Sequence, residues 1–117
     1  MDKADIIELN KNIGNRLKAV RHIYNEGMCL SVKQFAYLLD ISTEKLLNYE
    51  KGRTALPIDV LLKLYNRGIN PMFLITGENT IFTDTDAGQL LEKKIINKNP
   101  NYKLTMQEVL SKLHKKI

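Results

Sequence analysis

The sequence predicts an all-α protein in which five helices over residues 1–83 are followed by two more over residues 84–117. Apolar residues recur at three- and four-residue spacing along most of the chain, which is typical of amphipathic helices. Glycine, proline and short polar residues separate these segments at positions where helices usually begin and end. Only residues 80–83 alternate in the manner of a strand, and we expect weak extended structure there.

The first helix is expected to cover residues 6–24 and to be the longest of the domain. Gly14 lies within this helix but is not expected to end it. Gly27, in the connection over residues 25–29, marks its end. Its apolar residues fall on one stripe of a helix, at Ile6, Leu9, Ile13, Leu17, Val20 and Tyr24.

Two short helices follow, and a serine begins each of them. Ser31 with Gln34 three residues later forms a capping box for the second helix. Ser42 is the cap of the third helix, which ends at residues 50–53. The inward-facing residues of this pair are expected to be Phe35, Leu38, Leu39, Leu46 and Tyr49.

Proline and glycine delimit the fourth and fifth helices. Pro57 is placed in the first turn of the fourth helix, and Gly68 closes it. Asn70 caps the fifth helix, a single turn that stops at Gly77. The fourth helix carries an apolar face made of Ile58, Leu61, Leu62 and Tyr65.

Residues 84–117 are expected to form two amphipathic helices, capped at residues 84–86 and separated at residues 97–101. Two such short helices cannot bury both apolar faces on each other, so they need the first domain or another chain. We assign the second stripe to homodimerisation, with packing onto the first helix as the alternative. The stripe consists of Met106, Val109, Leu110, Leu113 and Ile117.

Composition excludes several functional classes. The chain has 117 residues, one cysteine and two distant histidines, so neither an internal disulfide nor a metal-ligand spacing is expected. It lacks an apolar run long enough to span a membrane and a recognisable signal peptide, which predicts a cytoplasmic protein with no membrane partner. Because phosphate-loop and catalytic-triad patterns are absent, we expect no enzyme activity, no cofactor and no small-molecule ligand.

Charge permits an anionic partner but does not name one. The formal net charge is +5. Residues 1–83 hold 11 Lys and Arg against 9 Asp and Glu, and residues 84–117 hold 7 against 4. The basic excess is mild everywhere, so any case for nucleic acid has to come from motifs.

The two short helices joined at residues 39–41 form a helix-turn-helix, a unit that can lay its second helix in a DNA major groove. The surrounding sequence resembles the helix-turn-helix family of phage repressors, Cro proteins and many bacterial regulators. Five segments in the family's order carry the resemblance: Ile13-Gly-Asn-Arg-Leu-Lys18, Leu30-Ser31 through Phe35-Ala36, Ile41-Ser42, Tyr49-Glu-Lys-Gly-Arg53 and Phe73-Leu-Ile-Thr-Gly-Glu78.

The resemblance implies a five-helix, lambda-repressor-like DNA-binding domain that reads bases from the first turn and middle of the third helix. Thr43, Glu44 and Asn48 match those positions. Asn48 could bond adenine bidentately, and Glu44 could accept a hydrogen bond from cytosine. Leu47 is expected to point outward, because Leu46 and Tyr49 supply the inward face, and to meet thymine methyl groups or a partner protein.

Cations flank the expected reading helix. We predict phosphate contacts from Arg16, Lys33, Lys45, Lys51 and Arg53, since affinity accumulates with each neutralised phosphate. The resemblance also implies an ion pair between Arg21 and Glu50 that orients the third helix on the domain.

The sequence thus predicts a transcriptional regulator that binds double-stranded DNA at a two-fold symmetric operator, as a homodimer and as a repressor. The alternative is an interaction module that keeps the fold without tight DNA binding. Val32, where the family usually has glutamine, motivates this alternative together with Glu44, Leu47 and the low charge of residues 1–83.

Overall fold

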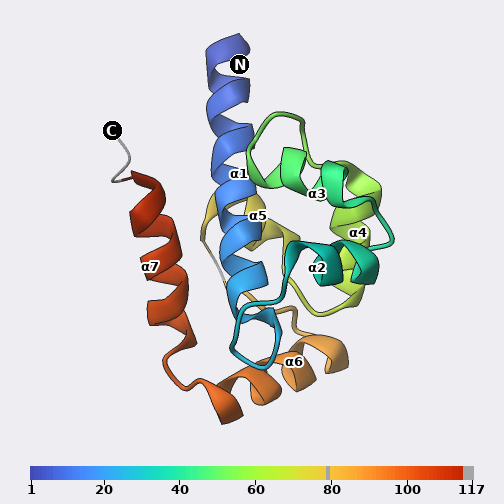
Figure 1. The fold of residues 1–117 in the computed structure, drawn as a ribbon, viewed down its shortest axis with the longest axis vertical. Helices are drawn as coiled ribbons and strands as arrows, with labels where there is room; N and C mark the ends of the chain where they lie inside the picture. The colour runs from blue at the N-terminus through green and yellow to red at the C-terminus, as the bar shows by residue number, and fades with distance from the viewer. Residues whose placement is uncertain (79, 115–117) are drawn as a thin grey trace.

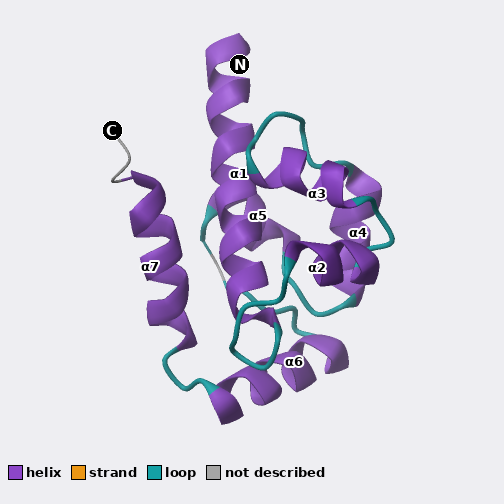
Figure 2. Cartoon of the chain, viewed as in Figure 1, coloured by secondary structure: helices purple, strands orange, loops and turns teal. Residues whose placement is uncertain are grey.

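The structure is a computed structural model that describes residues 1–78 and 80–114, and this part of the chain is all-helical (Figures 1 and 2). None of its helices combines the length and apolar character needed to cross a membrane. The helices are α1 (Lys3–Tyr24), α2 (Val32–Leu38), α3 (Thr43–Glu50), α4 (Ile58–Asn66), α5 (Pro71–Thr76), α6 (Asp86–Lys98) and α7 (Tyr102–His114).

The expected caps of the short helices are confirmed. Ser31 Oγ accepts from the Gln34 amide at 3.1 Å, while Gln34 Oε1 accepts from the Ser31 amide at 3.2 Å. Ser42 Oγ accepts from the Lys45 amide at 3.1 Å. At Gly77 the chain leaves α5 with φ at 75°, a left-handed conformation that glycine adopts without strain. These local interactions fix where α2, α3 and α5 begin or end.

Other boundaries differ from the sequence-based expectation. α1 begins three residues before Ile6, because Asp2 and Asp5 form a capping box that extends the helix. Pro57 is the N-cap of α4 and not a residue of its first turn. Residues 80–83 form no strand, and Phe82 makes only an isolated bridge with Ile69.

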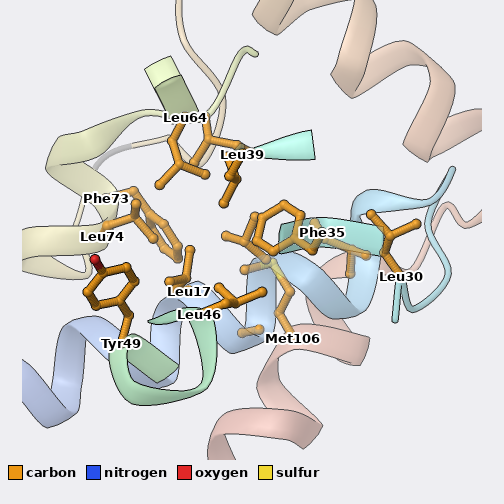
Figure 3. Close-up of a cluster of buried hydrophobic side chains, with 14 of the residues drawn as sticks. Leu17, Leu30, Phe35, Leu39, Leu46, Tyr49, Leu64, Phe73, Leu74 and Met106 are labelled. Atoms are coloured by element: carbon orange, nitrogen blue, oxygen red, sulfur yellow. The ribbon is translucent and has the colours of Figure 1, made fainter. Parts of the chain in front are cut away.

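The core lies around α1, which contacts α3, α5 and α7. Figure 3 shows buried apolar side chains that meet in one cluster, among them Leu17 of α1, Phe35 of α2 and Met106 of α7. The largest fully buried side chains include Leu17, Ile23, Phe35, Leu39, Leu46, Leu64, Leu74 and Ile95. The cluster therefore joins the first five helices to the C-terminal region and does not stop at residue 83.

α7 lies beside α1, on the other side from α3 in the view of Figure 1. Its position is fixed at the α6–α7 junction, where Asn99 Nδ2 donates to the Gly27 carbonyl at 2.8 Å and to Thr105 Oγ1 at 3.1 Å. Tyr102 packs edge-on against Phe82, with ring centroids 5.7 Å apart. The C-terminal helices are thus attached to both the α1–α2 loop and the core.

The packing of α7 favours the alternative interpretation of its apolar stripe, which was contact with the first helix rather than with a second chain. Met106 is only 3% exposed in the single chain, because α1 and the core already cover it. Val109 and Leu110 are half-buried and pack on the same core. The Leu113 side chain and Ile117 lie outside the described residues. The described part of the α7 stripe therefore packs on the core beside α1, which was the alternative interpretation, and dimerisation stays a prediction.

Candidate nucleic-acid interface

The turn between α2 and α3 holds the two helices against each other. Asp40 adopts a positive φ of 52°, and the Ile41 amide donates to the Ala36 carbonyl at 3.0 Å. The buried side chains of Ala36, Leu39 and Leu46 fill the angle between the helices. The two short helices therefore form one unit whose outer face is set by its inner packing.

The outer face of α3 carries the four residues predicted to contact bases. Thr43 and Glu44 are exposed, whereas Leu47 and Asn48 are half-buried. Within the described part of the chain, no hydrogen bond or ion pair engages the side chains of Thr43, Glu44 or Asn48. Their donors and acceptors are consequently free to meet an external partner. Leu47 is less outward than expected, because it faces the groove between α3 and α1.

Four of the five predicted phosphate-binding cations surround this face. Lys33, Lys45, Lys51 and Arg53 are exposed, and none forms an ion pair with a residue that the structure describes. They come from the start of α2, from α3 and from the loop after it. These charges are uncompensated, which is the state that favours binding of a polyanion.

Arg16 has a different role from the one predicted. Its Nη1 donates to the carbonyls of Leu74 and Ile75, both at 3.0 Å, and so satisfies the end of α5. Burial lowers the pKa of its guanidinium. The structure therefore makes Arg16 a helix-capping residue rather than a phosphate contact.

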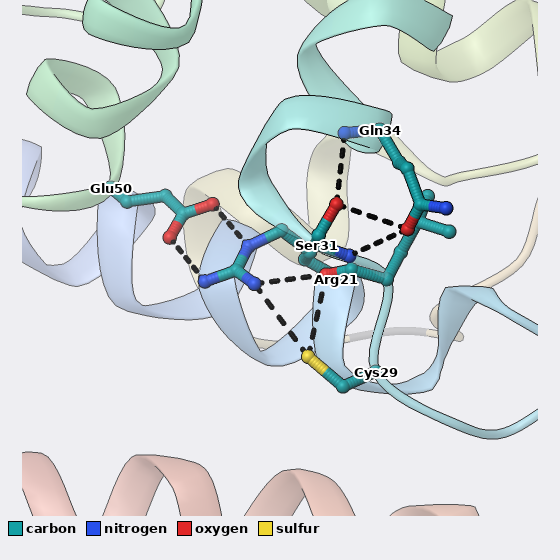
Figure 4. Close-up of polar contacts among 6 residues, drawn as sticks. Arg21, Cys29, Ser31, Gln34 and Glu50 are labelled. Carbon is teal, nitrogen blue, oxygen red and sulfur yellow. Dashed lines mark hydrogen bonds and ion pairs between the residues drawn. The ribbon is translucent and has the colours of Figure 1, made fainter.

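The predicted ion pair between Arg21 and Glu50 is present and buried (Figure 4). Arg21 Nε and Nη2 donate to the two carboxylate oxygens at 2.8 and 3.0 Å, while Nη1 donates to the Leu30 carbonyl at 2.9 Å. Burial disfavours the charge, but the hydrogen bonds and charge of Glu50 raise the pKa of Arg21. One guanidinium thereby links α1, the end of α3 and the residue before the α2 cap.

Gly14 brings the backbones of α1 and α3 together beside this pair. A Cβ atom there would lie 2.3 Å from the Tyr49 carbonyl oxygen and 2.6 Å from that of Glu50. Only glycine permits this approach without a shift of α3. The close contact and the ion pair together fix the orientation of α3 on the domain.

Two features of this region were not expected from the sequence. An apolar hollow of about 620 Å³ lies between α2 and α3, with Tyr37, Ile41 and Thr43 among its lining residues. Tyr37 is 83% exposed, so its ring borders the hollow without being covered. Cys29 is exposed and approaches Arg21 Nη1 at 3.6 Å. Lys33 and Tyr37 are four residues apart and therefore share one face of α2, and this spacing was the sequence feature that could have indicated the outer face.

The described part of the chain contains no group of three or more potential metal ligands. Comparison of the chain with protein-family models, with curated proteins and with solved structures finds no match. The resemblance to phage repressors and Cro proteins accordingly stays a prediction from the sequence motifs.

Proposed function

We propose that this protein is a sequence-specific DNA-binding regulator that acts as a repressor on a two-fold symmetric operator. The observation that carries the proposal is the combination found at α3. Its outer face presents unengaged polar groups, while its inner side is fixed by a buried ion pair and a backbone contact. A rigid helix with unengaged polar side chains suits base reading in the major groove.

The charges around α3 support the same proposal. Lys33, Lys45, Lys51 and Arg53 are exposed on α2, on α3 and in the loop after α3, and cations around a reading helix suit the phosphates that border a major groove. Glu44 is the exception, since its carboxylate repels phosphate and suits a cytosine amino group. We expect modest affinity with a marked preference for particular bases.

Selection from random-sequence DNA, followed by sequencing of the retained pool, tests the proposal directly. Enrichment of a two-fold symmetric motif is the expected result. Asn48→Ala is then expected to relax the preference at one base pair by about 1–3 kcal/mol, with little change in melting temperature. A pool without any enriched motif would contradict base reading.

Ser42→Ala is the matched control for Asn48→Ala on the same helix. It removes the cap bond to the Lys45 amide and is expected to cost about 1 kcal/mol of stability without altering the preferred bases. Equal loss of stability in the two variants would make Asn48 a structural residue.

The proposed operator symmetry requires a homodimer. Two recognition helices about 34–36 Å apart read successive major grooves on one side of a duplex. Sedimentation of the full chain with and without operator DNA measures the stoichiometry. Two chains per operator are expected, and one chain per operator would contradict the symmetric model.

A protein-interaction module is the second candidate, and the hollow between α2 and α3 favours it. Its lining is mainly apolar, and Tyr37 offers an exposed ring at its edge. Exposed apolar surface of this kind is typical of protein contacts. If the first proposal holds, Tyr37→Ala is expected to select the same DNA motif as the wild-type chain. If the wild-type chain itself selects no motif, the interaction module is favoured instead.

A further inference from the structure

A second row of basic residues lies beside α3, on the neighbouring helix α1. Lys11, Asn15 and Lys18 are spaced by four and three residues and therefore share one face of α1. They line a groove of about 370 Å³ whose opposite wall is α3, with Leu47 and Lys51. None of these α1 residues was among the predicted DNA contacts.

The charge of this groove is positive and uncompensated. Arg21 and Glu50 also line it, but they neutralise each other in the buried ion pair. Lys11, Lys18 and Lys51 form no ion pair with any residue in the described ranges 1–78 and 80–114. Three lysines thus line one concave surface, and the side-chain amide of Asn15 adds a further hydrogen-bond donor.

The groove is adjacent to the face proposed to read bases. Thr43, Leu47 and the C-cap residue Lys51 are spaced by four residues, so they form one row at the surface of α3 and its end. The last two members of that row are also the α3 wall of the groove. When α3 occupies a major groove, the strand that borders it therefore runs next to Lys11 and Lys18.

We propose that the α1–α3 groove binds the phosphodiester backbone of one DNA strand, with Lys11 and Lys18 as its principal contacts. This inference rests on the proposed function and adds a helix outside the helix-turn-helix to the DNA-binding surface. The pair widens the cationic surface along α1, and Asn15 lies between the two lysines. The contacts are sequence-independent, because they address phosphates and not base edges.

The test is the salt dependence of binding by the full chain to its selected operator. The double variant Lys11→Gln, Lys18→Gln removes two charges while keeping polar side chains that can donate hydrogen bonds. The slope of log K against log salt is expected to become shallower by about 0.9 for each lost phosphate contact per subunit. The preferred sequence is expected to stay the same.

Lys93→Gln, Lys94→Gln is the matched control. It removes the same charge from exposed positions of α6, which lies away from α3 at the lower end of Figure 1. An equal slope change in both double variants, or no change in the α1 variant, would overturn the groove contact while leaving the proposed function intact. A wild-type chain that binds no DNA would overturn both.

A second measurement separates DNA from free phosphate. The melting temperatures of the wild-type chain and the α1 double variant are compared with and without inorganic phosphate, at constant ionic strength. No difference between the two chains is expected. A phosphate-dependent rise confined to the wild-type chain would overturn the proposal in favour of a small-anion site.

Discussion

α3 and α7 both pack on α1, but they are held there by different means. α3 approaches so closely that only a glycine fits at residue 14, and a buried ion pair fixes its end. Asn99 attaches the start of α7 through hydrogen bonds, but the described contacts along the helix are mainly apolar, and Met106 is only 3% exposed. The outer face of α3 keeps polar groups without a hydrogen-bond partner in the described part of the chain, while the described part of the apolar stripe of α7 packs on the core beside α1.

The two kinds of contact suit helices with different roles. Directional contacts fix an orientation, which a helix needs if its outer side chains must meet fixed points on a partner. Apolar contacts depend on the buried area and are less specific in angle. We infer that α3 is positioned for recognition and that α7 stabilises the domain.

The largest expected effect is that of deleting α6 and α7 by truncation after Thr83. This removes the buried side chains of Ile95, Tyr102 and Met106, each worth about 1.5–3 kcal/mol. A domain of ordinary stability, about 5–15 kcal/mol, would be brought close to unfolding. Thermal melts followed by circular dichroism measure the loss.

Truncation after Ser111 is the control, because it keeps all three buried residues. It is expected to melt near the temperature of the full chain. If the chain ending at Thr83 melts there too, α7 contributes little, and the contrast with α3 is lost.

Glu50→Ala is expected to have the next largest effect. It leaves the Arg21 guanidinium buried without its carboxylate, and removal of one partner of a buried pair typically costs about 3–5 kcal/mol. Glu44→Ala, an exposed change on the same helix, should stay within about 0.5 kcal/mol. Urea unfolding at neutral pH compares the two, and similar small losses would mean that the pair does not hold α3.

Gly14→Ala is expected to destabilise the protein by about 1–3 kcal/mol, because a Cβ atom there would overlap the carbonyls of Tyr49 and Glu50. The higher helix propensity of alanine offsets up to about 1 kcal/mol of this. Asn97→Ala on the exposed part of α6 controls for propensity alone. A Gly14→Ala chain as stable as that control would show that α3 shifts freely.

The smallest expected effect is an alkaline weakening of α7. Burial, followed by the charge of Glu92, raises the pKa of Tyr102. The folded state thus favours the neutral phenol, and its contribution is complete below the unfolded pKa of about 10 and is lost as pH rises through the folded pKa. Melting temperatures across this range are expected to fall less steeply in Tyr102→Phe. Identical pH profiles would exclude a contribution from Tyr102.

Local features of the fold were predictable from the sequence. Ser31, Ser42 and Asn70 cap their helices through bonds to amides two or three residues away, so the signal and its effect lie in one short segment. The Arg21–Glu50 pair spans 29 residues, and only the family resemblance suggested it.

Contacts between segments far apart in the sequence were not predictable. The basic residue Arg16 looks like any phosphate-binding cation until α5, 58 residues later, presents its carbonyls. The apolar stripe of α7 would fit α1 or a second chain equally well, since periodicity describes a face but not what covers it. The groove along α1 exists only because α3 packs beside it, so the spacing of its lysines in the sequence did not indicate a binding surface.

The packing of α7 on α1 has a consequence for folding. The two helices lie at opposite ends of the chain, so their contacts close a loop of about 80 residues or more, and such non-local contacts slow folding. During synthesis, α1 emerges before α7, so its α7-facing side stays uncovered until α7 has also left the ribosome. We expect the domain to complete its folding only after α7 has emerged, with the docking of α7 on α1 as the slow step.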